Sequence, residues 1–273
     1  MSTHMTIILW KTLKAHRWPV LVMALLLLGL GVLFPTSYSS FGPEGVPDFW
    51  EKLPKGIAAL MKTEGTALAA AGPEGYIAIG LRHPLVLIVL SAFAIATASG
   101  AMAREVEQRT ILILLARPVP RYRLVLARWL ESLVGLIVMI VALLAGIYIG
   151  VLIQGLSEQV STGTLLAVGF NVLCLAVAVL GFSYLISAQA DDGGRATLLA
   201  TGLAVAFFFV DFLAALFESL EPLSLLSIFH YYDPVGLVVD ASFPGLHVAV
   251  LLATGIVTFG AGILIFERRD IAA

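Results

Sequence analysis

Few side chains in this sequence have the type and spacing that catalysis or cofactor binding requires. Neither phosphate-binding motif, Gly-x-x-x-x-Gly-Lys-Ser/Thr or Gly-x-Gly-x-x-Gly, occurs in the 273 residues. The five histidines are scattered and only one cysteine, Cys174, accompanies them, so zinc-type spacing is missing. His230 and Asp233 have the spacing of a ligand or acid–base pair, but Tyr231 and Tyr232 between them favour an interfacial aromatic cluster. We expect no catalytic site, cofactor or metal on this chain.

Asp211 is an acidic residue inside an apolar run, Phe207–Leu213. Ionisable groups at membrane depth are costly and usually face a bundle interior or a wet cavity. Counting from Thr197 places Asp211 in the outer third of its run, and Asn171 lies at a similar depth in the preceding run. Two interpretations stay open: both residues line a translocation path, or Asp211 makes a structural hydrogen bond to a neighbouring helix, with Asn171 as the candidate partner.

The composition places these residues in a membrane protein. Apolar residues make up 60% of the chain and charged residues 12%, whereas soluble domains average about 45–50% and about 25%. The dense basic stretch Arg104–Arg128 lies between two apolar runs, which argues against nucleic-acid binding. Small residues four apart, Gly146 with Gly150 and Ala96 with Gly100, have the spacing of close helix approach. Six runs are long enough to span a bilayer: Val20–Phe34, Pro84–Met102, Leu130–Ile153, Thr164–Ser187, Thr197–Phe217 and Leu246–Phe266.

The distribution of lysine and arginine predicts the orientation of these spans. Six crossings put both termini on one side, and that side holds 12 of the 16 basic residues: three at the N-terminus, six in the second connection, one in the fourth and two at the C-terminus. The positive-inside rule therefore predicts that both termini are cytoplasmic. Residues 1–17 are predicted to form an interfacial helix, with a longer first span as the alternative. Residues 35–83 form a predicted outer loop.

The second connection, residues 103–128, has the most distinctive pattern. Charged Arg104–Arg109 is followed by the short apolar segment Thr110–Leu115. Arg117-Pro118 ends that segment, because proline disfavours helix at the preceding residue, and basic Arg121–Arg128 leads into the third span. A short apolar helix bracketed by charge suits a groove on a soluble partner; the alternative is a helix resting on lipid headgroups.

This connection resembles that of the type-2 ABC exporter permeases. They show a Glu-x-Glu-x-Gly-Thr pattern, an apolar stretch and Arg-Pro-Val-Ser-Arg before the third span. Arg109 stands where Gly is common and Pro120 where Ser is common, departures that bear on the local docking geometry. The C-terminal segment Phe266–Ile271 also resembles the ending of these permeases. Within the family, the chain most resembles the single-domain permeases related to the copper-enzyme maturation transporter. The matching residues are Glu105, Glu107, Thr110, Leu112, Leu115, Arg117, Pro118, Val119 and Arg121.

The resemblance implies an all-α membrane protein, one permease domain over residues 1–273 of an exporter in the cell membrane. Two copies, or one copy and a paralogue, would form the path. Each would dock a separate cytoplasmic ATPase, which holds the ATP and Mg, and the substrate would be amphipathic or lipophilic. The implied docking residues are Arg104, Glu105, Glu107, Thr110, Leu112, Leu115, Arg117, Pro118 and Arg121, and the residues proposed for the path are Asn171 and Asp211.

Two other function classes stay open. In a proton-coupled secondary transporter Asp211 would carry the proton, although no inverted repeat or second buried carboxylate is visible for a relay. A membrane enzyme would require polar residues clustered at one depth, and only Asn171 and Asp211 approach that. Direct copper transport is disfavoured, since one cysteine and six dispersed methionines supply few soft ligands.

Overall fold

The computed structural model describes residues 17–38, 40, 71–108, 120–240 and 242–269, and within these ranges the regular structure is helical. Six helices are long and apolar enough to cross a membrane, which confirms the expected number of spans. They are Arg17–Tyr38, Pro84–Glu107 (α5, Pro84–Ala101, and α6, Ala103–Glu107), α8 (Arg121–Ile153), α9 (Thr162–Gln189), α10 (Gly193–Leu216) and α12 (Gly245–Arg268). The shorter elements are α4 (Gly72–Leu81), the 3₁₀ helix η1 (Glu218–Leu226) and α11 (Pro234–Val239).

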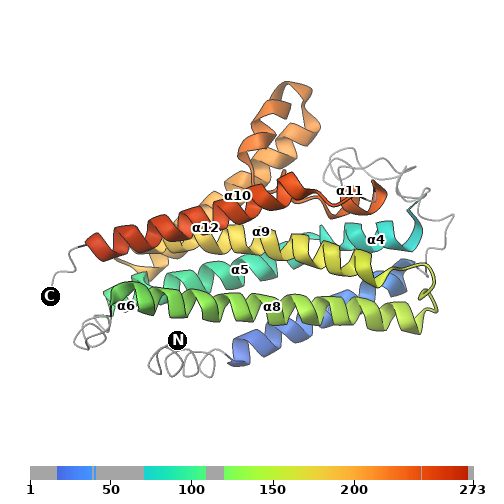
Figure 1. Cartoon of the computed structure of the whole chain (residues 1–273), viewed down its shortest axis with the longest axis horizontal. Helices are drawn as coiled ribbons and strands as arrows, with labels where there is room; N and C mark the ends of the chain where they lie inside the picture. The colour runs from blue at the N-terminus through green and yellow to red at the C-terminus, as the bar shows by residue number, and fades with distance from the viewer. Residues whose placement is uncertain (1–16, 39, 41–70, 109–119, 241, 270–273) are drawn as a thin grey trace.

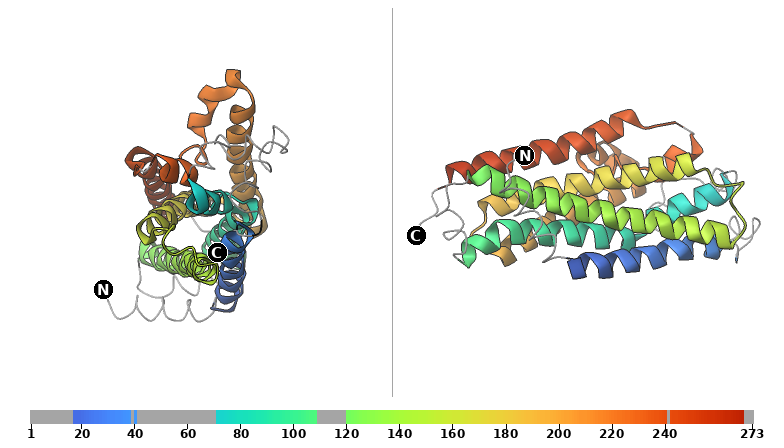
Figure 2. Two further views of the ribbon diagram at one scale, coloured as in Figure 1. Left: turned by 90° about the vertical axis from the view of Figure 1, so that its right-hand side faces the viewer. Right: turned by 60° about the horizontal axis from the view of Figure 1, so that its bottom comes forward.

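The long helices alternate in direction, so that the end of α6, the start of α8 and the end of α12 lie at the same end of the bundle (Figure 1). We call this the basic end: it contains α6, the first turns of α8, the turn between α9 and α10, and the last turn of α12. The opposite end contains α4 and α11. In the end-on view of Figure 2 most long helices are seen nearly along their axes, whereas α10 runs across the view and projects from the bundle together with η1.

Helix α9 is the centre of the bundle. It contacts α5, α8, α10 and α12, most extensively α12, and nearly all of its residues from Val168 onward are buried. Small residues make this possible. A Cβ atom on Gly181 would lie 2.1 Å from the carbonyl oxygen of Gly255 in α12, and one on Gly255 would lie 2.7 Å from the carbonyl oxygen of Val177. The two backbones therefore touch at a position that only glycine fits.

The first helix packs on α8 in the same way, at one of the small-residue pairs expected from the sequence. A Cβ atom on Gly146 would lie 2.1 Å from the carbonyl oxygen of Leu28, and one on Gly150 would lie 2.9 Å from that of Val32. The Gly146–Gly150 pair is therefore confirmed as a site of close approach. A Cβ atom on Gly100, by contrast, has nothing within 4 Å, so Ala96–Gly100 does not mark such a contact.

Local signals set the helix ends. A polar turn follows α9, and there Asp192 caps α10 by accepting a hydrogen bond from the Arg195 amide at 2.7 Å. Gly155, at φ +68°, ends α8 in the left-handed conformation that glycine adopts without strain. Met102, with φ −130° and ψ −63°, separates α6 from α5.

Helices extend beyond several of the predicted boundaries. The third span begins at Arg121, not at Leu130, because the basic residues before it continue the same helix outside the apolar run. Residues 35–83 are not all loop, since the first helix continues to Tyr38 and α4 occupies Gly72–Leu81. The predicted interfacial helix lies outside the described residues, except Arg17, which begins the first span.

The apolar segment after α10 folds back onto that helix as η1. The hydroxyl of Ser227, directly after η1, donates to the carbonyl oxygen of Phe207 at 2.7 Å. Phe229 then packs edge-to-face against Phe208, with ring centroids 5.6 Å apart. Tyr232 is fully buried and donates to the carbonyl oxygen of Leu81 at 2.9 Å, which attaches this segment to the end of α4.

We predict that Gly181→Val destabilises the fold, because the added side chain must displace the backbone of α12. Overpacking of this kind costs about 1–3 kcal/mol or more, and a thermal-unfolding series in detergent would measure the loss. Gly202→Val in α10 is the matched control, since a Cβ atom there has nothing within 4 Å. Equal transition temperatures for the two variants would contradict the close packing of α9 on α12.

Candidate functional site

The predicted docking segment is only partly described. Thr110, Leu112, Leu115, Arg117 and Pro118 lie outside the described residues, so the short helix expected there stays a prediction. Both flanks of the segment, residues 103–108 and 120–128, are described. Their contacts define the site, because a docked partner at this segment would act on the bundle through them.

An ion pair connects the two flanks. Nη2 of Arg128, on α8, donates to Oε1 of Glu105, on α6, while Nη1 of Arg128 lies 3.8 Å from Oε2 of buried Glu131. Four residues further along α8, the Ser132 hydroxyl lies 3.3 Å from the hydroxyl of Tyr184 on α9. Tyr184 is fully buried. Arg128 thus joins the start of α8 to α6. Charged hydrogen bonds of this kind are stronger than neutral ones.

Glu107 connects the same flank to α10. Its Oε2 accepts a hydrogen bond from the backbone amide of Gly193 at 3.0 Å, at the helix N-terminus, where a carboxylate is favoured. The amide of Ala103, at the start of α6, donates to the Ser187 hydroxyl of α9 at 3.1 Å. The short α6 is therefore held by α8, α9 and α10 together.

Arg269 connects the other flank to the end of α9. Its Nη1 donates to the carbonyl oxygens of Ala188 and Ala190, at 2.9 and 2.8 Å, and its Nη2 pairs with Asp191. These bonds satisfy carbonyls that the end of a helix leaves without partners. Arg121, the first residue of α8, donates to the carbonyl oxygen of Arg269 at 2.8 Å. Arg121 thus contacts the C-terminal end of α12, which in turn caps α9.

These contacts form the basic-end network, which we define as Glu105, Glu107, Arg121, Arg128 and Arg269. Three of its members were predicted to contact a partner protein, yet each makes a hydrogen bond within the chain. Arg104, the fourth predicted docking residue that is described, is exposed. The network joins the ends of five helices, α6, α8, α9, α10 and α12.

A polar cavity of about 500 Å³ lies directly inside this network. The first helix, α5, α6, α8 and α9 all contribute to its wall. The charged and polar side chains that line it are Thr97, Arg104, Glu105, Gln108, Arg128, Glu131, Ser132 and Tyr184.

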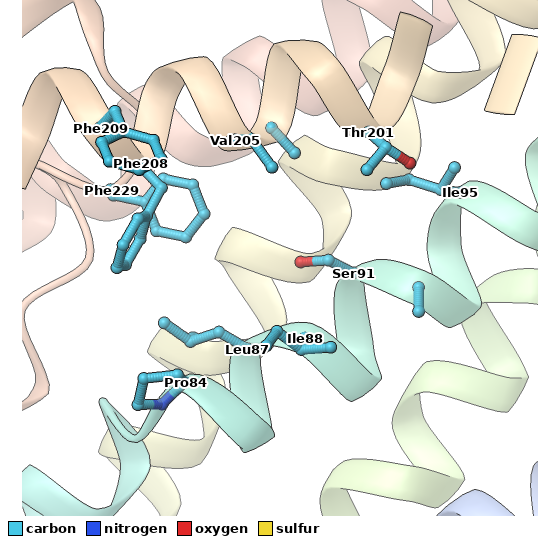
Figure 3. Close-up of a pocket in the computed structure, with 12 residues that line it drawn as sticks. Pro84, Leu87, Ile88, Ser91, Ile95, Thr201, Val205, Phe208, Phe209 and Phe229 are labelled. Carbon is cyan, nitrogen blue, oxygen red and sulfur yellow. The ribbon is translucent and has the colours of Figure 1, made fainter. Parts of the chain in front are cut away.

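A second, apolar pocket of about 300 Å³ lies between α5 and α10. Figure 3 shows Phe208 and Phe209 of α10, with Phe229, on one side of it, and Pro84 and Leu87 of α5 on the other. Ser91 and Thr201 supply the two hydroxyl groups of a wall that is otherwise apolar. A pocket of this composition suits an apolar molecule with few hydrogen-bonding groups.

The two residues proposed for a translocation path do not meet as expected. Asn171 is fully buried in α9, and among the described residues neither of its side-chain polar atoms has a hydrogen-bond partner, so the expected bond to Asp211 is not formed. Neither residue lines the polar cavity or the apolar pocket. Asp211 is buried near the end of α10, where its charge acts on Arg82.

Arg82 is the centre of an ion cluster at the opposite end. Its side chain is 8% exposed, and its Nη1 lies 3.7 Å from Oδ1 of Asp233. Burial lowers the pKa of the Arg82 guanidinium, while the charges of Asp233 and Asp211 counteract that shift. This favours the structural interpretation of Asp211, with Arg82 in the place where the sequence suggested Asn171. No local pattern indicated this role for Arg82, because it stands between two helices in the predicted outer loop.

The two residues of the candidate pair, His230 and Asp233, have different neighbours. Asp233 caps α11 through the Gly236 amide at 3.1 Å and faces Arg82. His230 packs against the rings of Tyr231 and His247, with centroids 5.0 and 5.9 Å away. His230 is thus part of an aromatic cluster, as one interpretation predicted, but Tyr232, which was expected in the same cluster, is buried and bonded to Leu81. In the part of the chain that the structure describes, no group of three or more His, Cys, Asp or Glu residues has a metal-holding arrangement.

The comparison with protein families identifies the chain. Residues 8–271, nearly its whole length, match the family described as ABC-2 family transporter protein, and the chain belongs to that family. It is a multi-pass membrane protein and the membrane component of an ABC transporter. A comparison with curated proteins finds no match to the chain.

We predict that Arg82 and Asp211 are energetically coupled. Arg82→Met removes the guanidinium, so that Asp211→Asn should cost less stability in that background than in the native protein, with a coupling of about 0.5–3 kcal/mol. A double-mutant cycle of unfolding free energies measures it. The pair Arg82→Met and Glu158→Gln, which replaces an exposed carboxylate, serves as the control. Additive effects of Arg82→Met and Asp211→Asn would contradict the coupling and would favour the interpretation in which Asp211 lines the translocation path.

Proposed function

We propose that the chain is the transmembrane subunit of an ATP-driven exporter that docks a separate ATPase and moves an amphipathic or lipophilic substrate out of the cytoplasm. The family match carries this proposal, since it extends over nearly the whole chain. Families of this type typically leave ATP hydrolysis to a partner, which agrees with a sequence that contains no phosphate-binding motif. The copper-enzyme maturation type stays a proposed subgroup.

The basic end is proposed to face the cytoplasm. Arg17, Arg104, Arg128, Arg195 and Arg269 lie there, whereas in the described residues Arg82 is the arginine near the opposite end, where acidic residues surround it. The positive-inside rule then gives the N-in, C-in orientation.

The segment at residues 109–119 is proposed to dock the ATPase. Its support is the basic-end network, because Glu105, Glu107, Arg121 and Arg128 join the flanks of the segment to α9, α10 and α12. A displacement of the segment by a closing ATPase would then move several helix ends together. Rigid-body motion of this kind is a common mechanism of alternating access.

A pair of permease chains, identical or paralogous, is proposed to enclose the path. The apolar pocket between α5 and α10 is a candidate part of it, because α10 projects from the bundle and exposes Phe209 and Val205 beside the pocket. A lipophilic substrate fits this wall, whereas a copper ion does not, since neither histidine, cysteine nor methionine lines the pocket. Asp211 gives the proton-coupled alternative little support, since its charge interacts with that of buried Arg82.

Co-purification with candidate ATPases tests the docking proposal. We predict that the native chain forms a stable complex that hydrolyses ATP in mild detergent, and that Leu112→Asp with Leu115→Asp abolishes complex formation, because two charges enter an apolar contact. The same positions changed to Met form the matched control and should keep the complex. Retention of the complex by the Asp variant would contradict docking through this segment.

Narrowing the apolar pocket tests the substrate proposal. We predict that Val205→Trp fills part of the space and lowers the ATPase stimulation by lipophilic compounds at least tenfold, while the ATPase complex persists. Leu198→Trp is the control: it lies on the same helix, is exposed and does not line the pocket. Equal stimulation in both variants would exclude this pocket from the path.

A further inference from the structure

The polar cavity at the basic end has an amphipathic lining. One part of its wall is apolar and comes from the first helix and α5, with Pro19, Met23, Phe93 and Ala96. The other part carries charges of both signs, Arg104 and Arg128 against Glu105 and Glu131. Its volume of about 500 Å³ lies in the range of small-molecule sites, which is about 300–1,000 Å³.

The depth of the cavity relative to the bilayer can be inferred from the exposed apolar residues of α8. Along this helix the exposed large apolar residues run from Val134 to Ile153, apart from Tyr122 at its start. That stretch is 20 residues, or about 30 Å at 1.5 Å per residue, which equals the hydrocarbon thickness of a bilayer. Glu131 and Arg128 precede that stretch by three and six residues, about 4.5 and 9 Å along the axis, and therefore lie just outside the hydrocarbon. This is the level of lipid headgroups.

The charges of the cavity lie within a thin layer. Glu131 is three residues after Arg128 on α8, about 4.5 Å along the axis, and Glu105 pairs with Arg128 directly. Arg104 is next to Glu105 on α6 and lines the same cavity. Guanidinium and carboxylate groups at one depth present complementary partners to a molecule that carries a phosphate and an ammonium group together.

We propose that this cavity binds the headgroup of a zwitterionic phospholipid, of the phosphatidylethanolamine type, from the leaflet at the basic end. Arg104 and the hydroxyl groups of the wall contact the phosphate, and Glu105 and Glu131 contact the ammonium group. The first part of an acyl chain lies along Met23 and Phe93. The site is separate from the pocket between α5 and α10 and does not depend on the proposed transport function.

The ligand would contact the basic-end network, because Glu105 and Arg128 belong to both. A bound headgroup adds charged contacts to α6 and α8, whose ion pair connects the flanks of the segment at residues 109–119. The lipid is therefore expected to stabilise the folded chain, as any ligand that binds only the native state does.

Native mass spectrometry of the delipidated full chain tests the proposal. Phosphatidylethanolamine and phosphatidylglycerol with identical acyl chains are added in turn, and we expect one phosphatidylethanolamine to bind saturably with at least tenfold preference. Glu131→Gln should remove that preference. Glu267→Gln is the matched control, because Glu267 is exposed near the same end on α12 and does not line the cavity. Phosphatidylethanolamine should also raise the unfolding temperature of the native chain more than that of Glu131→Gln.

Three results would overturn the proposal. Equal occupancy of the two lipids would show ordinary annular lipid, and an unchanged preference in Glu131→Gln would place the bound lipid elsewhere. The third result is complete displacement of the lipid by soluble phosphoethanolamine at equal concentration. It would show that the cavity binds the free headgroup compound and not a lipid. A Glu131→Gln chain that unfolds at the native temperature without lipid confirms that its loss of binding is not a loss of fold.

Discussion

Close contact between helix backbones is the constraint on which the rest of the structure depends. Lipid tails are as apolar as the side chains of the bundle, so burial alone gives helices little reason to associate, and close packing must supply the attraction. Gly181 and Gly255 bring α9 against α12, and Gly146 brings α8 against the first helix. With α9 fixed, Tyr184 and Trp129 both pack on Phe259 of α12, with ring centroids 5.4 and 4.7 Å away. The helix ends are placed by these contacts.

Beyond the hydrocarbon the same helix ends are joined by charge. At the basic end Arg128 pairs with Glu105, Glu107 receives the first amide of α10, and Arg269 caps α9 while it accepts from Arg121. At the opposite end Arg82 pairs with Asp233, and the charge of Asp211 also acts on it. Apolar packing thus holds the spans, and ionic contacts in a wetter layer hold their ends. In the sequence, the segment proposed to dock the ATPase stands between Glu107 and Arg121, two members of that ionic layer.

The sequence predicted the fold class well and the site only in part. Six apolar runs, the turn capped by Asp192 and the Gly146–Gly150 contact follow from local patterns, which survive in lipid because each span forms its own backbone hydrogen bonds. The partner of Asp211 could not be predicted, because Arg82 is distant from it in sequence and no local pattern connects the two residues. Glu131 was missed because it stands inside the run Leu130–Ile153, which was read as an apolar span. Glu105, Glu107 and Arg121 were read for charge alone, and their internal partners come from α8, α10 and α12.

Site-specific photo-crosslinking tests the central claim most directly, namely that the segment between the two flanks of the basic-end network contacts an ATPase. A photoreactive residue is placed at position 113 in the full chain, which is co-expressed with the ATPase, and at exposed position 158 near the opposite end as the comparison. The account predicts an ATPase adduct from position 113 and none from position 158. Adducts from position 113 that contain only lipid, beside an intact ATPase complex, would contradict it and would place the contact elsewhere on the chain.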